Sequence, residues 1–95
     1  MGNKSRSAEL KTDVGRRLRV TRLALGMAQN EFAARAGIAA NTYSMYESGD
    51  RLITVENALA MCEAHGLTMD WLYRGIPGDP PHKLATAVIA LLDVQ

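Results

Sequence analysis

The chain has 95 residues, of which 47% are hydrophobic, so it is long enough for one domain with one core. No apolar run reaches the roughly 18–20 residues that are needed to cross a bilayer. A single cysteine excludes an internal disulfide framework, and with no signal peptide we expect a soluble chain in a reducing cytosol. The formal net charge of +1 excludes a uniformly basic protein.

The charges are unevenly distributed along the chain. Residues 1–22 carry seven Lys or Arg against two carboxylates, whereas residues 56–95 carry two Lys or Arg against five carboxylates. A basic N-terminal third can lie along phosphates while an acidic third faces away. Such a run is also typical of a solvated helix face, and charge alone does not separate the two interpretations.

The first predicted elements are an arm and a long helix. Residues 1–9 are small, polar and basic, which predicts a flexible arm. A helix is predicted from about Leu10 to Leu25, and Gly26 is typical of the residue that follows a helix end. Its apolar stripe follows the 3.6-residue period and contains Val14, Leu18, Thr21 and Leu25.

Residues 29–49, QNEFAARAGIAANTYSMYESG, read as two short helices joined by a tight turn. The turn contains Gly37, which adopts a positive φ without a Cβ penalty. We also expect Ala33 and Gly37 to let the two backbones approach closely at a steep angle. This arrangement is that of a helix-turn-helix, whose second helix, here 40–48, is offered to the major groove of DNA. The inner faces are predicted to contain Phe32, Ala33 and Ala36, then Tyr43 and Tyr46.

Two further helices complete the predicted domain. Thr54 is a good N-cap for a helix that ends at His65, and we expect Leu59 and Cys62 to form its inner apolar face. A short helix capped by Thr68 then precedes Gly75.

A proline-containing segment precedes a last predicted helix at 83–94. This helix is apolar nearly all round, so it must be buried either on its own domain or against a second copy. We favour a second copy, because the prolines separate it from the five preceding helices. The predicted organisation is therefore an arm at 1–9, a DNA-binding domain at 10–76, and a linker with a dimerisation helix at 77–95. The dimerisation residues are Leu84, Val88, Ile89, Leu91 and Leu92.

With these helices placed, residues 14–75 resemble the phage repressor and Cro family, the XRE type of helix-turn-helix regulator. The matching stretches are RRLRVTRLALGMAQNEFAARAGI, NTYSMYESGDR and LTMDWLYRG, and the resemblance covers about two thirds of the chain. It implies an all-α, five-helix lambda-repressor-like domain that binds double-stranded DNA. It further implies a repressor that acts as a homodimer on a palindromic operator without a cofactor.

The resemblance also implies roles for particular residues. Gln29 would bind a backbone phosphate, although it is also a plausible cap of its own helix. Arg22 and Glu47 would form an ion pair that joins the first helix to the third. The full set of expected phosphate contacts is Gln29, Asn30, Arg16, Arg17, Arg22, Thr42 and Arg51.

The expected base-reading residues are Ala40, Asn41, Ser44 and Met45, which share one side of a helix. The Asn41 amide has the geometry to pair with adenine, and Met45 can contact a thymine methyl group or fill a gap at an interface. This chain departs from the family at Ala39, where a Ser or Thr cap is common, and no Arg or Lys lies on the reading side. We therefore expect a site richer in A·T than in G·C pairs.

Other chemistry has little support in the sequence. His65 and His82 have no partner at a zinc spacing, Cys62 is most simply a small core residue, and no signature of an enzyme is present. The alternative to a transcriptional regulator is an antitoxin or another interaction module whose main partner is a protein. The apolar stretch 83–94 motivates that alternative.

Overall fold

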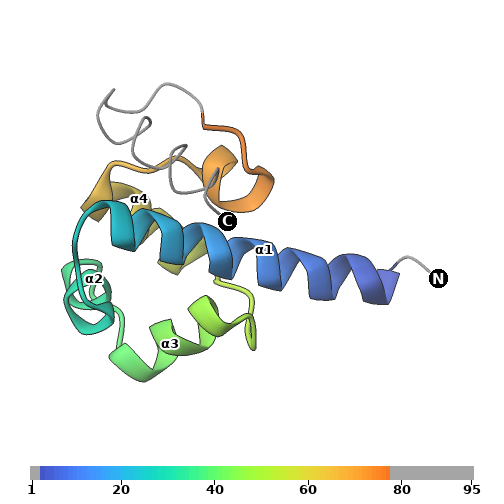
Figure 1. Cartoon of the computed structure of the whole chain (residues 1–95), viewed down its shortest axis with the longest axis horizontal. Helices are drawn as coiled ribbons and strands as arrows, with labels where there is room; N and C mark the ends of the chain where they lie inside the picture. Colours follow the sequence, from blue (N-terminus) through green and yellow to red (C-terminus); the bar gives the residue numbers. More distant parts are fainter. Residues whose placement is uncertain (1–2, 78–95) are drawn as a thin grey trace.

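The computed structural model describes residues 3–77, which form five helices and no strand (Figure 1). The helices are α1 (Asn3–Ala24), α2 (Gln29–Arg35), α3 (Ala40–Ser48), α4 (Val55–His65) and the short π-helix η1 (Asp70–Arg74). The all-α fold expected from the sequence is therefore confirmed. The predicted helix at 83–94, with its dimerisation residues, lies outside the described residues. No helix within 3–77 combines the length and apolarity needed to span a bilayer.

α1 begins at Asn3 and not at about Leu10. Residues 3–9 thus extend the helix instead of forming the expected flexible arm. These positions contain neither proline nor glycine, and most of them are good helix formers. The Thr12 hydroxyl also donates to the carbonyl of Ala8, 3.0 Å away. In Figure 1 the first half of α1 extends beyond the rest of the domain.

α1 is the central helix of the fold. α2 and α3 lie below it in Figure 1 and η1 lies above it. The predicted stripe faces this core, because Val14, Leu18 and Thr21 are all buried. Val20 is completely buried as well, although it lies off that stripe, because α1 packs against both α3 and η1. The Thr21 hydroxyl accepts a hydrogen bond from the Trp71 indole, which attaches η1 to α1.

α1 and α3 approach each other closely at Gly15, a position that the sequence reading did not single out. A Cβ atom there would lie 2.6 Å from the Tyr46 carbonyl oxygen and 2.7 Å from that of Glu47. Glycine in α1 therefore allows the C-terminal turn of α3 to pack directly on the α1 backbone. Gly37 has the expected positive φ of 71°, but a Cβ atom there would have open space around it. The expectation that Gly37 serves close packing is thus wrong, and its role is conformational.

α4 begins and ends as predicted, and the Thr54 hydroxyl accepts from the backbone N–H of Asn57. Its inner face was predicted wrongly. The buried residues are Ala58, Met61 and His65, whereas Leu59 is 49% exposed. α4 instead turns the side that carries the buried ring of His65 toward α2. That ring stacks on Phe32 of α2 at a centroid distance of 4.0 Å, and its Nε2 lies 2.9 Å from the Phe32 carbonyl oxygen.

Candidate nucleic-acid interface

α3 has one buried side and one exposed side. Tyr43 and Tyr46 are the buried residues, as the sequence predicted, and the Tyr43 ring meets Phe32 of α2 edge-on. Asn41 and Ser44 are exposed on the opposite side. Of the four predicted base-reading residues, Ala40, Asn41 and Ser44 are exposed and Met45 is half-buried.

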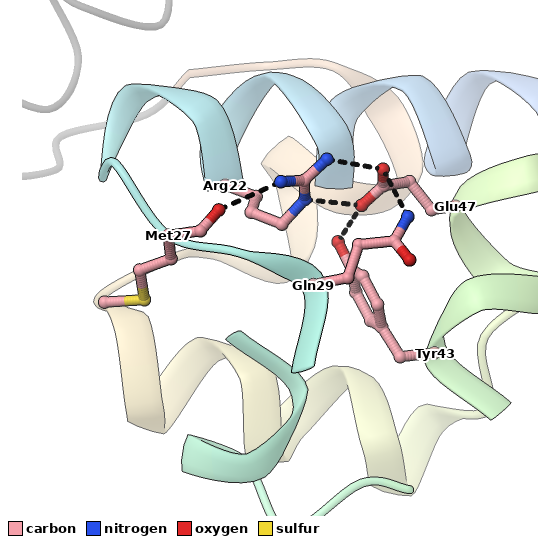
Figure 2. Close-up of polar contacts among 5 residues, drawn as sticks. All are labelled: Arg22, Met27, Gln29, Tyr43 and Glu47. Carbon is pink, nitrogen blue, oxygen red and sulfur yellow. Dashed lines mark hydrogen bonds and ion pairs between the residues drawn. The ribbon is translucent and has the colours of Figure 1, made fainter. Parts of the chain in front are cut away.

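The buried side of α3 is held by the carboxylate of Glu47, whose side chain is only 6% exposed (Figure 2). Arg22 of α1 donates to both of its oxygens, from Nε and Nη2, each at 2.9 Å. Gln29 of α2 donates to Oε1 at 3.0 Å, and the Tyr43 hydroxyl donates to Oε2 at 2.5 Å. We call Arg22, Gln29, Tyr43 and Glu47 the Glu47 network. It joins all three helices that position the reading side.

The protonation states of the Glu47 network are well defined. Burial by itself would raise the pKa of Glu47, but the hydrogen bonds from Arg22, Tyr43 and Gln29 outweigh it and lower that pKa. The hydrogen bond to Glu47 raises the pKa of Arg22. Burial, reinforced by the bond to Glu47, raises the pKa of the Tyr43 phenol far above its ordinary value. At neutral pH the carboxylate and the guanidinium are therefore charged and the phenol is neutral.

The N-terminus of α3 lacks the expected kind of cap. Ala39 occupies the N-cap position and makes no side-chain hydrogen bond there. Instead, Asn41 Oδ1 accepts from the backbone N–H of Thr42 at 3.0 Å. Asn41, which was expected only to read bases, thus satisfies one of the free backbone N–H groups at the start of α3.

The residues expected to contact phosphate differ widely in accessibility. Arg16 is open to solvent: its side chain is 51% exposed and lies 3.6 Å from the Asp13 carboxylate. Arg22 is only 13% exposed, and its guanidinium donates both to Glu47 and to the Met27 carbonyl (Figure 2). Gln29 is likewise tied to Glu47. The others are Asn30 and Arg51, which are exposed, and Thr42, which is half-buried.

Arg17, which was expected to contact phosphate, is engaged within the fold. Its Nη1 donates to the Leu72 carbonyl of η1 at 3.0 Å, and its side chain is 13% exposed. The guanidinium also packs against Gly75, where a Cβ atom would lie 2.9 Å from Nη2. Burial lowers the pKa of Arg17, an effect that the Asp13 carboxylate partly opposes. Arg17 holds the end of η1 against α1.

The sequence reading also missed the hydroxyl of Tyr43. It assigned Tyr43 to the core on the strength of its ring, but the spacing to Glu47 is four residues, which lets two side chains meet on a helix. That spacing was the available signal. Within residues 3–77 no group of acidic, His and Cys side chains has the arrangement needed to hold a metal ion.

Comparison with known proteins identifies one family. A family model described as helix-turn-helix matches residues 18–72, which is more than half of the chain. No curated protein and no solved structure matches the sequence.

Proposed function

Since the chain belongs to the XRE type of helix-turn-helix proteins and is therefore a DNA-binding transcriptional regulator, we propose that it represses transcription by binding a palindromic operator as a homodimer. The observation that carries this proposal is the accessible side of α3. Its opposite side is fixed to α1 and α2 through Glu47, so the accessible side has a defined orientation. A helix held in this way can enter a major groove without rearrangement.

The chemistry of that accessible side favours A·T pairs. Asn41 can donate to N7 and accept from N6 of an adenine, and Ser44 can bond to either kind of base edge. Ala40 and Met45 offer only apolar contacts, which suit thymine methyl groups. No Arg or Lys occurs between Ala40 and Ser48, so the bidentate guanine contact is absent from this helix.

Phosphate contacts on both sides of α3 would position the helix. We assign this role to Arg16 and Arg51, whose side chains are exposed, and to the polar residues Gln29, Asn30 and Thr42. Arg22 is engaged by Glu47 and contributes mainly by orienting the network. As a dimer, the protein would place two copies of α3 in successive major grooves about 34 Å apart and would occlude the promoter. Dimerisation is assigned to the apolar residues of 83–94.

Selection of bound sequences from a random DNA pool tests this proposal. We expect the full-length protein to enrich an inverted repeat with A·T pairs at the contacted positions, and light scattering of the complex to give two chains per duplex. An enriched pool without an inverted repeat, or one chain per duplex, would contradict the homodimer.

Replacement of Asn41 tests the reading side directly. Asn41→Ala should cost about 1–3 kcal/mol on the selected site and relax the base preference at one position, while binding to unrelated DNA stays nearly unchanged. The measurement is a titration of both duplexes by fluorescence anisotropy. Glu63→Ala, an exposed change on α4, is the control and should bind as the wild type does. Equal affinities of Asn41→Ala and wild type for the selected site would refute the assignment.

A further inference from the structure

Most of the basic side chains in the described part of the chain are used in ion pairs, but three are not. The cations that pair with a carboxylate are Arg16, Arg17, Arg22, Arg35 and Arg74. Among the described residues, no ion pair and no side-chain hydrogen bond involves Lys11, Arg19 or Arg51. Arg19 and Arg51 are exposed, and Lys11 is half-buried. The charges of these three side chains are therefore open to an anion from outside the domain.

These three residues surround the C-terminal turn of α3. That turn packs on Gly15 of α1, where a Cβ atom would lie 2.6 Å from a backbone oxygen of α3. Lys11 and Arg19 lie four residues before and after Gly15, so they share its side of α1, about 6 Å along the helix axis in each direction. Arg51 follows the same turn, and its backbone N–H donates to the Met45 carbonyl at 3.2 Å. We call Lys11, Arg19 and Arg51 the α3-end cluster.

The end of α3 is closed without the side chains of this cluster. Lys and Arg side chains can serve a fold by donating to the last carbonyl groups of a helix. Here the backbone N–H groups of Gly49, Asp50 and Arg51 already donate to carbonyl groups of that turn. The carboxylate of Asp50, which lies at the same end, accepts a hydrogen bond from the Ser48 hydroxyl at 2.9 Å. The local structure therefore gives the three cations no internal task.

We propose that the α3-end cluster binds the DNA backbone, with Lys11 and Arg19 as phosphate contacts in addition to Arg51. This inference rests on the proposed entry of α3 into a major groove. The groove is bordered by the phosphates of both strands, so cations that flank one end of the reading helix lie where they can fix its register. Lys and Arg suit this position, because their stems stay packed on the helix while the charged groups reach outward.

Removal of single charges from the full-length protein tests this proposal. Lys11→Gln and Arg19→Gln should each reduce the slope of log affinity against log salt concentration by about 1. Each should weaken the selected site and unrelated DNA by the same factor, because a phosphate contact carries no sequence information. Arg74→Gln is the control matched in charge, since Arg74 is exposed on η1, on the other side of α1 from α3 (Figure 1). Its slope should equal that of the wild type.

Two further measurements separate DNA contact from a role in the fold. Arg19→Lys keeps the charge and should restore the slope, and the urea midpoints of all these variants should match that of the wild type. A lower midpoint with an unchanged slope would assign the cluster to the fold and overturn the proposal. Uncharged methylphosphonate groups, placed one at a time in the selected duplex, locate the contact. One of them should weaken binding by the wild type but not by Arg19→Gln.

The outcomes also separate this inference from the function on which it rests. If the wild type selects a site and Asn41→Ala impairs its binding, but Lys11→Gln and Arg19→Gln keep the full salt slope, only the α3-end cluster is refuted. If the wild type selects no DNA, the proposed function fails and this inference fails with it.

Discussion

At the scale of single residues, Glu47 determines how α3 is presented. One carboxylate accepts hydrogen bonds from α1, α2 and α3 itself, and it does so with only 6% of the side chain exposed. A buried carboxylate is tolerable only when its oxygens are satisfied, so loss of any donor is costly. The Tyr43 hydroxyl is one of these donors, and the sequence reading did not single it out.

Tyr43→Phe should destabilise the protein by about 1.5–3 kcal/mol, because it removes a hydrogen bond to a charged group without removing the buried ring. Tyr46→Phe is the matched control. Its hydroxyl accepts only from the neutral amide of Asn57, so that change should cost about 0.5–1.5 kcal/mol. Urea unfolding of the two variants provides the comparison. A smaller loss for Tyr43→Phe than for Tyr46→Phe would mean that the Glu47 network is not held by this hydroxyl.

His65 makes stability depend on pH. Burial lowers the pKa of His65, the bond to the Phe32 carbonyl opposes that shift, and the charge of Arg35 adds to it. The unfolded chain, with an ordinary value of 6.5, therefore takes up the proton first as the pH falls. The contribution to stability is fully present above about pH 6.5 and is lost as the pH falls through the folded pKa.

Urea midpoints measured between about pH 7.5 and about pH 5 should thus decrease for the wild type. His65→Gln keeps an N–H donor for the Phe32 carbonyl but cannot titrate, so its midpoint should change much less across that range. Glu47 does not interfere, because its lowered pKa confines its own effect to more acidic solutions. Identical pH profiles for the two proteins would exclude His65 as the cause.

At the scale of elements, the contact between α1 and α3 depends on Gly15. Ala favours a helix over Gly by about 1 kcal/mol, so Gly15→Ala would stabilise an isolated α1. In the folded protein the new Cβ would meet two backbone oxygens of α3 at under 3 Å, and α3 must move. We expect a net loss of about 1–3 kcal/mol and weaker binding to the operator.

Gly66→Ala is the control for that change. It lies after α4, has open space around a new Cβ, and its φ of 71° makes alanine unfavourable by about 1–2 kcal/mol. Both variants should therefore lose stability in urea unfolding, but only Gly15→Ala should lose DNA affinity beyond its unfolded fraction. Equal DNA affinities after correction for folding would show that α3 accommodates the extra methyl group.

At the scale of the whole molecule, two neighbouring arginines of the basic N-terminal third have different surroundings. Arg16 is open to solvent, whereas Arg17 is used inside the fold to hold η1. Arg16→Ala should weaken binding to all DNA alike and reduce the slope of affinity against salt by about 1. Arg17→Ala should leave that slope unchanged and cost about 1.5–3 kcal/mol of stability. Salt titrations and urea unfolding test both variants, and a reduced slope for Arg17→Ala would restore it as a phosphate contact.

Much of this molecule was predictable because its signals are local. Glycine stops, the Thr54 cap and the 3.6-residue period of α1 each depend on a few neighbouring residues, and the helices from α2 to α4 lie where these signals predicted. The outward side of α3 was also predictable, because two tyrosines define its inner side. The extent of α1 was not, since a run of polar helix formers is compatible with either an arm or a helix.

The sequence by itself determined that this chain forms a helix-turn-helix and which residues of α3 face outward. Only the tertiary structure decided which apolar side of α4 is buried, since a helix that is apolar on two sides has two rotations compatible with its pattern. It likewise decided that Arg17 serves the fold, because its partner Leu72 is 55 residues away in the chain. Contacts between distant segments depend on how the helices pack, and no local pattern encodes them.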